Sequence, residues 1–339
     1  MNLSFFNITN SYSNINRSRQ INDGITYLMV LGILNLVGFI INSITMAHSL
    51  RNRRALATID HLLRNLLLSN IFNSLAWIIA TANKIVAKQA DWPLYTIDIA
   101  CKLKNLFWLT CYTISVFILT LLSIERYRAI IYPTKSRLRG RKLYVIILLT
   151  WLSSIITSFP IIFITTVDLV FELDCSLKIE KPSIFYFIYV VFLQIVDYIL
   201  PLCIMLYCYS HTIIKLGKIS INVITNKTAL FARQRRKKRC IKMLIWLTAC
   251  FIITALPWMF RFNVALFRNN LLSFIFHQKY NYFLNNFFQS IPLITLLSLT
   301  YNPIFYFLFY RCNRRVENVH FLGNRQQILM SRKLTVVND

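Results

Sequence analysis

The stretch Cys101–Pro133, CKLKNLFWLTCYTISVFILTLLSIERYRAIIYP, decides the fold of this chain. In an α-helix, the path from Cys101 to Arg126 covers about 37 Å, roughly the depth of a bilayer with part of its interfaces. The centre is almost wholly apolar, and the Glu125-Arg126-Tyr127 triplet leads into a basic loop. We therefore expect a membrane-spanning helix whose two ends face opposite compartments.

The composition places the whole chain in a membrane. Hydrophobic residues make up 56% of the sequence and the mean hydropathy is +0.53, whereas about 45–50% apolar residues is typical of soluble domains. Stretches long enough to cross the hydrocarbon core occur at about 27–50, 62–86, 99–131, 144–166, 184–213, 243–260 and 282–309. Only helices satisfy their own backbone polar groups in lipid at these lengths. The sequence predicts an all-α fold, a seven-transmembrane helix bundle.

The positive charge has a topological explanation. The net charge is +26, and 27 of the 38 Lys and Arg residues fall in the connections and tail on one side of the predicted membrane. The positive-inside rule makes that side cytoplasmic, so we expect an extracellular amino terminus and a multi-pass protein of the plasma membrane. Nucleic acid is not an expected partner. Three glycosylation sequons, at Asn2, Asn7 and Asn16, lie on the side assigned as extracellular.

The third predicted span resembles the third helix of rhodopsin-like (class A) G-protein-coupled receptors, in which an Asp/Glu-Arg-Tyr motif ends the helix. Other family motifs follow in order, one set for each predicted segment. They are Asn42, Cys101, Arg126, Trp151, Cys175, Pro201, Pro257 and Asn302-Pro303-x-x-Tyr306. The general pattern is most similar to invertebrate neuropeptide receptors, including the FMRFamide-like group. The resemblance implies a receptor, with no enzymatic activity and no cofactor, that binds an extracellular peptide or small-molecule ligand and activates a heterotrimeric G protein.

Within that resemblance the chain has three parts: an extracellular tail at 1–26, the receptor domain at 27–309, and a cytoplasmic amphipathic helix and tail at 310–339. The basic-aromatic stretch 307–319 resembles the short eighth helix, which lies along the membrane and contacts lipid. The basic run 233–239 sets topology as a solvated inner face, or contacts anionic lipid or a G protein.

The resemblance also assigns the residues of activation, with Arg126 at the centre. In the family this arginine is held by carboxylates when the receptor is inactive. The matching positions here are Glu125, Arg126, Tyr127, Tyr209, Phe251, Pro257, Asn302, Pro303 and Tyr306. The sixth span begins with Lys237, Lys238 and Arg239, so it offers no acid to Arg126. We therefore expect raised basal activity.

Two positions depart from the family pattern. Asn70 stands where an aspartate binds a sodium ion together with groups that correspond to Ser115, Ser298 and Asn302. A neutral amide offsets the desolvation of a cation poorly, which puts sodium modulation in doubt. Ala255 replaces a tryptophan often regarded as a rotamer switch, so other contacts must trigger activation.

Of the eight cysteines, Cys101 and Cys175 are the pair predicted to face an oxidising compartment. They match the family's disulfide between the third helix and the second outer loop. The bond would hold an acidic loop over the helix bundle.

The candidate ligand-binding residues are Trp108, Gln194, Asp197 and Arg261. Trp108 occupies the position at which aminergic receptors carry an aspartate, which argues against a biogenic amine. An ionisable residue inside a span is a functional candidate by default. Asp197 either pairs with a basic ligand group or forms a structural bond to Gln194 or a tyrosine.

Other functions remain open at this point. Within the receptor class, a chemosensory role for small molecules competes with a neuropeptide ligand, and a receptor fold that no longer couples is a third reading. A transporter would show internal repeats with matching Gly/Pro-interrupted spans, which this sequence with its 6 glycines lacks. The expected motifs of metal sites, hydrolases and phosphate loops are not present either.

Overall fold

The computed structural model describes residues 2–51, 58–89, 93–132, 140–168, 174–177, 184–222, 228–267 and 291–308, except 292, 295 and 298. Only the backbone is described at 2–25, 87–89, 167–168, 174–177, 216–222, 228–237, 240 and 261–267. The stretch 310–339, with the expected eighth helix beyond residue 308, lies outside the described residues.

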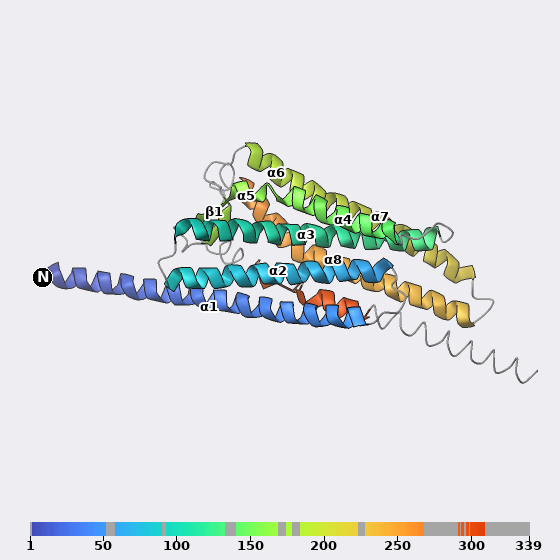
Figure 1. Cartoon of the computed structure of the whole chain (residues 1–339), viewed down its shortest axis with the longest axis horizontal. Coiled ribbons are helices and arrows are strands. Elements are labelled where there is room, and N and C mark those ends of the chain that lie inside the picture. Colours follow the sequence, from blue (N-terminus) through green and yellow to red (C-terminus); the bar gives the residue numbers. More distant parts are fainter. Residues whose placement is uncertain are drawn as a thin grey trace, which may run out of the picture.

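Long helices lie side by side in one bundle, as Figure 1 shows. They are α1 (Asn2–Arg51), α2 (Thr58–Gln89), α3 (Leu94–Ile131), α4 (Arg141–Ser158), α6 (Ile184–Gln194), α7 (Leu200–Asn222) and α8 (Thr228–Phe267). A short α5 (Ile161–Ile164) follows Pro160, and a single π-helical turn, η1 (Ile195–Ile199), joins α6 to α7. Residues 299–308 form the last described helical stretch.

Six segments of the described residues are long and apolar enough to cross a membrane: Thr26–Arg51, Thr58–Val86, Leu94–Ile131, Arg141–Ile164, Ile184–Lys215 and Ile241–Phe260. Each one overlaps the corresponding span predicted from the sequence. The seventh predicted span, at 282–309, is helical over its described part from residue 291. The helix α1 also continues back through the segment 2–25, which the sequence assigns to an extracellular tail.

The helix α3 is the centre of the bundle. In its most apolar window 72% of the residues are buried, against 22–39% in the other five candidate spans. The main apolar cluster gathers Ile114, Ile118 and Leu122 of α3 with residues of α2, α4, α7, α8 and the last helix. By contrast, Leu148, Leu149 and Ile156 of α4 are more than half exposed. Such a face suits contact with lipid chains.

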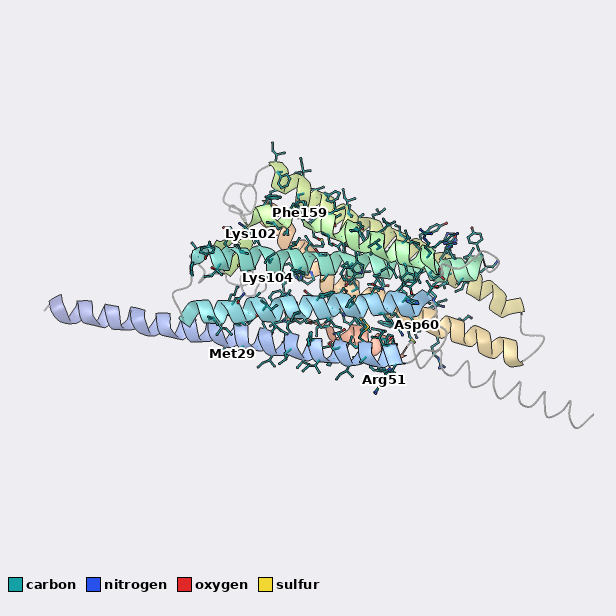
Figure 2. All side chains as sticks on the ribbon, in the orientation of Figure 1. Met29, Arg51, Asp60, Lys102, Lys104 and Phe159 are labelled. Atoms are coloured by element: carbon teal, nitrogen blue, oxygen red, sulfur yellow. The ribbon has the colours of Figure 1, made fainter. Side chains whose placement is uncertain are left out.

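One small sheet lies at the same end of the bundle as the first turns of α3. The strands β1 (Thr165–Asp168) and β2 (Asp174–Leu177) are antiparallel, with Val167 opposite Cys175. The sequence did not predict this hairpin. Figure 2 shows Lys102 and Lys104 near it, whereas Arg51 and Asp60 lie at the opposite end of the bundle. The two ends of the bundle therefore differ in structure.

Buried amides join helices that are distant in the sequence. Asn42 of α1 donates from Nδ2 to the carbonyl oxygen of Leu299 at 2.9 Å, and its Oδ1 accepts from Nδ2 of Asn70 at 3.1 Å. The indole Nε1 of Trp151 donates to Oδ1 of Asn65 at 3.1 Å, which ties α4 to α2. Because lipid offers no hydrogen bonds, these groups stabilise the bundle only where they meet each other.

Gly38 allows α1 to approach the last helix closely. A Cβ atom at this position would lie 2.8 Å from Cδ1 and 3.0 Å from Cβ of Leu299. At Gly32, two turns earlier, a Cβ would lie at an ordinary 3.5 Å from Cγ2 of Thr81. The two glycines therefore differ sharply in the space available to them.

We predict that Gly38→Ala destabilises the protein while Gly32→Ala does not. Overpacking against Leu299 should cost about 1–3 kcal/mol and weaken the Asn42 bond beside it. The measurement is the thermal unfolding midpoint of the two variants and the wild type, purified in the same detergent. Equal midpoints for the two variants would show that this contact does not hold α1 in place.

Candidate functional site

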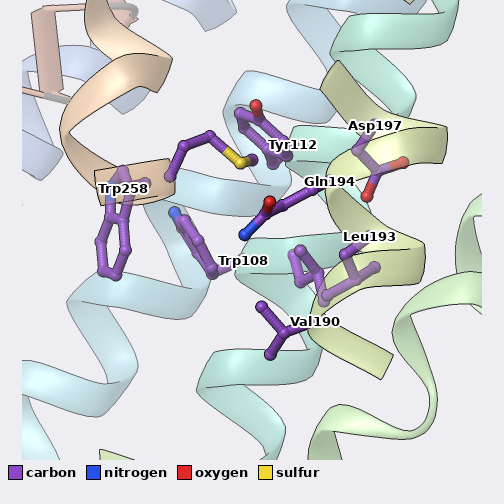
Figure 3. A pocket seen from close by; sticks show the side chains of 9 residues that line it. Trp108, Tyr112, Val190, Leu193, Gln194, Asp197 and Trp258 are labelled. Atoms are coloured by element: carbon purple, nitrogen blue, oxygen red, sulfur yellow. The ribbon is translucent and has the colours of Figure 1, made fainter. Parts of the chain in front are cut away.

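A pocket lies between α3, the α6–η1 helix and α8, toward the end of the bundle that carries the hairpin (Figure 3). Its cavity volume is about 10 Å³, roughly the room that one water molecule needs. The lining residues are Trp108, Leu109, Tyr112, Val190, Leu193, Gln194, Asp197, Trp258 and Met259. The pocket is thus nearly closed, mainly apolar, and contains one carboxylate and one amide.

Aromatic rings of α3 and α8 meet at this level. The ring centroids of Trp108 and Trp258 are 4.3 Å apart. Tyr112 stacks on Trp108 at 6.0 Å and on Phe251 at 5.5 Å. Offset ring pairs at such distances stabilise a contact beyond the area that they bury. Any change in the spacing of α3 and α8 must therefore disturb these rings.

Asp197 belongs to the π-helical turn and is only 1% exposed. Its Oδ2 accepts a hydrogen bond from Oγ1 of Thr113, on α3, at 3.0 Å. The sequence suggested Gln194 or a tyrosine as a structural partner of this carboxylate, whereas the bond that the described residues show comes from the hydroxyl of Thr113. Single π-helical turns widen a helix locally and occur often at functional sites.

Three of the four candidate ligand residues meet in this pocket. Figure 3 shows Gln194 reaching toward Trp108, with Asp197 farther along the same helix. The side chain of Arg261 lies outside the described residues. Sequence reasoning missed Trp258 and Tyr112. Each had a signal: Trp258 directly follows Pro257, and Tyr112 lies one helical turn after Trp108.

Ala255 fills the family's tryptophan position in α8, but another tryptophan of the same helix lies close by. Ala255 is buried, as is Phe251 one turn earlier. Pro257 lies inside α8. The tryptophan of this helix that lines the pocket is Trp258, about one turn nearer the outer end than the family position that Ala255 fills.

The hairpin and the start of α3 meet above the pocket. Nδ2 of Asn105 donates to Oγ1 of Thr165, the first residue of β1, at 3.2 Å. Cys101 is buried and disulfide-bonded. The backbone of Cys175 lies in β2, and its side chain is outside the described set.

Two of the residues assigned to a degenerate sodium site, Asn70 and Ser115, form hydrogen bonds with neutral groups. Asn70 donates to Asn42, as above, and the Oγ atoms of Ser115 and Ser69 lie 3.2 Å apart. Oγ of Ser115 also donates to the carbonyl oxygen of Cys111 at 2.9 Å. Asn302, which belongs to the Asn302-Pro303-x-x-Tyr306 motif, is buried. Ser298 lies outside the described residues. No carboxylate stands among these described side chains.

At the opposite end of α3, the triplet residues point in different directions. Glu125 is 4% exposed, and Arg126 is partly buried. The ring of Tyr127 contacts those of Tyr132 and Tyr207, with centroids 6.0 and 5.9 Å away. Tyr127 therefore packs toward α7.

The two other tyrosines assigned to activation are buried. The hydroxyl of Tyr209 lies 3.1 Å from Oγ1 of Thr248, which links α7 to α8. Tyr306 is 4% exposed, and its ring centroid is 5.9 Å from that of Phe307. Pro303 is buried one turn before it.

The three predicted glycosylation sites belong to a segment of which only the backbone is described. Asn2, Asn7 and Asn16 lie in the part of α1 of which only the backbone is described. Among the described residues there is no group of three His, Cys, Asp or Glu side chains that could hold a metal ion.

The chain is similar to known receptors over most of its length. Residues 41–306 match the family described as "7 transmembrane receptor (rhodopsin family)". The G-protein coupled receptor homolog Q2/3L of sheeppox virus (strain KS-1) is 30% identical over 216 residues, 62% of this chain and 51% of that protein. The substance-K receptor of Canis lupus familiaris is 24% identical over 81% of this chain and 69% of its own length. The tachykinin-like peptides receptor 86C of Drosophila melanogaster is 23% identical over 73% and 50%.

The matching region thus spans about half to two thirds of these curated relatives. The family match covers the Asp/Glu-Arg-Tyr position, Pro257 and the Asn302-Pro303-x-x-Tyr306 motif. It also supplies the seventh span that the described residues show only in part. The family consists of receptors, not enzymes. On this match the chain belongs to the rhodopsin family of seven-transmembrane receptors.

Proposed function

We propose that this chain binds an extracellular peptide and activates a heterotrimeric G protein from the plasma membrane, with its amino terminus outside the cell. The observation that carries this proposal is the pocket between α3, α6–η1 and α8, which brings Trp108, Gln194 and Asp197 together. A concave site with an aromatic lining and few polar groups is what a receptor needs to hold part of a ligand.

The relatives favour a peptide among possible ligands. Several are named as receptors of substance K, substance P or tachykinin-like peptides. The outer connection that holds the hairpin carries Asp168, Glu172, Asp174 and Glu180, and such acidic loops attract basic peptides over a distance. A small-molecule chemosensor is the second candidate, and it is favoured by the nearly closed cavity.

The hairpin acts as a lid in this proposal. Cys101 on α3 is disulfide-bonded, and we assign Cys175 in β2 as its partner because both belong to the outer end of the bundle. The bond would fix the acidic connection beside the pocket entrance. The sequons at Asn2, Asn7 and Asn16 would then face the same compartment and carry glycans.

The opposite end would meet the G protein. We assign that contact to Arg126, with Tyr209 and Tyr306 as the tyrosines that join it when α8 moves outward. In the described structure Tyr209 is bound to Thr248 of α8, which is an arrangement expected of a closed cytoplasmic face. A ligand that binds the open state better than the closed one would shift this equilibrium.

Membrane lipid is the other partner in the proposal. The basic run that begins α8 would lie at the inner surface, where each Lys or Arg gains about 1 kcal/mol from anionic lipid. The stretch 307–319 would rest on the same surface as an amphipathic helix.

We predict that G-protein activation depends on Arg126. The measurement is nucleotide exchange or second-messenger output in cells that express the wild type, Arg126→Ala or Arg141→Ala, with and without a neuropeptide library that includes tachykinins. Arg141 begins α4 at the same end of the bundle and is exposed, so it is a matched control. We expect Arg126→Ala to remove the signal, including ligand-free signal, and Arg141→Ala to retain it.

Surface expression of all three proteins must be equal, as measured with an extracellular tag. A response only to small molecules would favour the chemosensor. A well-expressed wild type that is silent with and without every ligand would favour a fold that does not couple.

We predict that sodium does not stabilise the wild type. Asn70 already donates to Asn42, and a neutral amide cannot compensate a cation for its lost hydration. The unfolding midpoint of the purified receptor should be the same in sodium chloride and choline chloride at equal ionic strength. Asn70→Asp should instead show a midpoint that rises with sodium by several degrees, since binding to the folded state alone stabilises it.

A sodium-dependent midpoint in the wild type would contradict this prediction. Asn70→Ala serves as the control, because it removes the bond to Asn42 without providing a charge.

A further inference from the structure

One carboxylate oxygen of Asp197 is available to a ligand. It is 1% exposed, and Thr113 binds its Oδ2, but its Oδ1 has no hydrogen-bond donor in the described part of the chain. No described basic side chain forms an ion pair with it. A carboxylate at membrane depth costs much free energy unless it is paired. The carboxylate of Asp197 is therefore buried at a cost in free energy, and only one of its two oxygens accepts a hydrogen bond from the described residues.

The hydrogen bond to Thr113 does not by itself account for the charge. An asparagine would accept the same bond through its amide oxygen and would avoid the desolvation of a carboxylate. The position therefore has a reason to be an acid beyond its contact with α3. A positive charge or a strong donor brought by a ligand would supply that reason.

The surroundings suit a cation. Trp108, Tyr112 and Trp258 line the same pocket as Asp197, and the faces of such rings attract positive charge, with tryptophan the strongest. The hydroxyl of Tyr112 also has no hydrogen-bond partner within the described structure. A carboxylate beside aromatic rings repels anions and offers nothing particular to an apolar group.

We propose that Asp197 is the counter-ion of a positively charged nitrogen in the ligand, an ammonium or guanidinium group held between this carboxylate and the rings of Trp108 and Trp258. This inference rests on the proposed function and deepens it by naming the chemistry of the ligand. Since the cavity now admits about one water molecule, the pocket must widen for the group to enter, and separation of the two indoles would provide that room. Binding would thereby favour the state in which α8 is farther from α3.

The first test needs no ligand. The unfolding midpoint of the purified receptor is compared between the wild type, Asp197→Asn and Asp98→Asn. Asp98 lies on the same helix as Thr113 but is 30% exposed and paired with Lys102 at 2.6 Å, so it is a matched acid in a wetter place. We expect Asp197→Asn to raise the midpoint and Asp98→Asn to leave it nearly unchanged. A midpoint that is unchanged or lowered by Asp197→Asn would overturn the proposal.

The second test uses pairs of amidated peptides that differ only in charge. In each pair, lysine is exchanged for norleucine or arginine for citrulline, and G-protein activation is measured in cells. On the wild type the basic member should be about tenfold more potent or better, because charged hydrogen bonds are the strong ones. Asp197→Asn should remove this difference, while Asp98→Asn should preserve it.

The outcomes separate the two proposals. Equal potency within every pair on a responding wild type would overturn the role of Asp197 and leave the peptide receptor standing. No response to any peptide would count against the proposed function. In that case an unchanged or lowered midpoint for Asp197→Asn would still overturn the role of Asp197, and a raised midpoint would support an unpaired charge at this position.

Discussion

The amide of Asn42 is the interaction on which the arrangement of the bundle depends most directly. It donates to a carbonyl oxygen of the last helix and accepts from Asn70 of α2, so one side chain joins three helices. Because the bilayer core contains no water, a polar group there must find its hydrogen-bond partner within the protein. The close approach at Gly38, one turn away, is what brings the Leu299 carbonyl within reach.

Around this fixed side of the bundle, α8 is held by a few contacts of a different kind. Trp258 packs against Trp108 near the pocket, the hydroxyl of Thr254 lies 3.2 Å from that of Tyr301, and Thr248 lies by Tyr209. These are ring contacts and single hydroxyl pairs, each of modest strength. The bundle therefore combines a firmly bonded side, α1 and α2 with the last helix, and a side that can be released stepwise.

The sequence alone was sufficient for the spans and their order, because each span is a long apolar run and membrane thickness fixes its length. It also identified Trp108, Gln194 and Asp197 as ligand candidates, and these three do line one pocket. What it could not supply were contacts set by rotation and local winding. Thr113 meets Asp197 in the π-helical turn η1. Pro201 in the middle of a span is compatible with a local bulge, but it does not tell which residues the bulge brings together.

The hairpin was missed for a related reason. Its strands are four residues long and lie in a polar connection, where hydropathy carries no signal for pairing. Trp258 lies three residues after Ala255, the position at which the family pattern places a tryptophan. The family pattern specifies a sequence position, whereas the contact with α3 is made by the large ring of α8 that lies nearest to it, which is Trp258.

The placement of Trp258 has a mechanical consequence. Running from the inner to the outer end, α8 passes Ala255, then Pro257, and only then Trp258. Ala255, the position of the family's tryptophan, lies inside the turn whose backbone hydrogen bond Pro257 removes. A ring at Trp258, about 4.5 Å farther out, acts across the point where proline removes a backbone hydrogen bond. A helix that lacks this bond bends more easily at that point, so a displacement of Trp258 and the resulting displacement of the inner segment need not be equal.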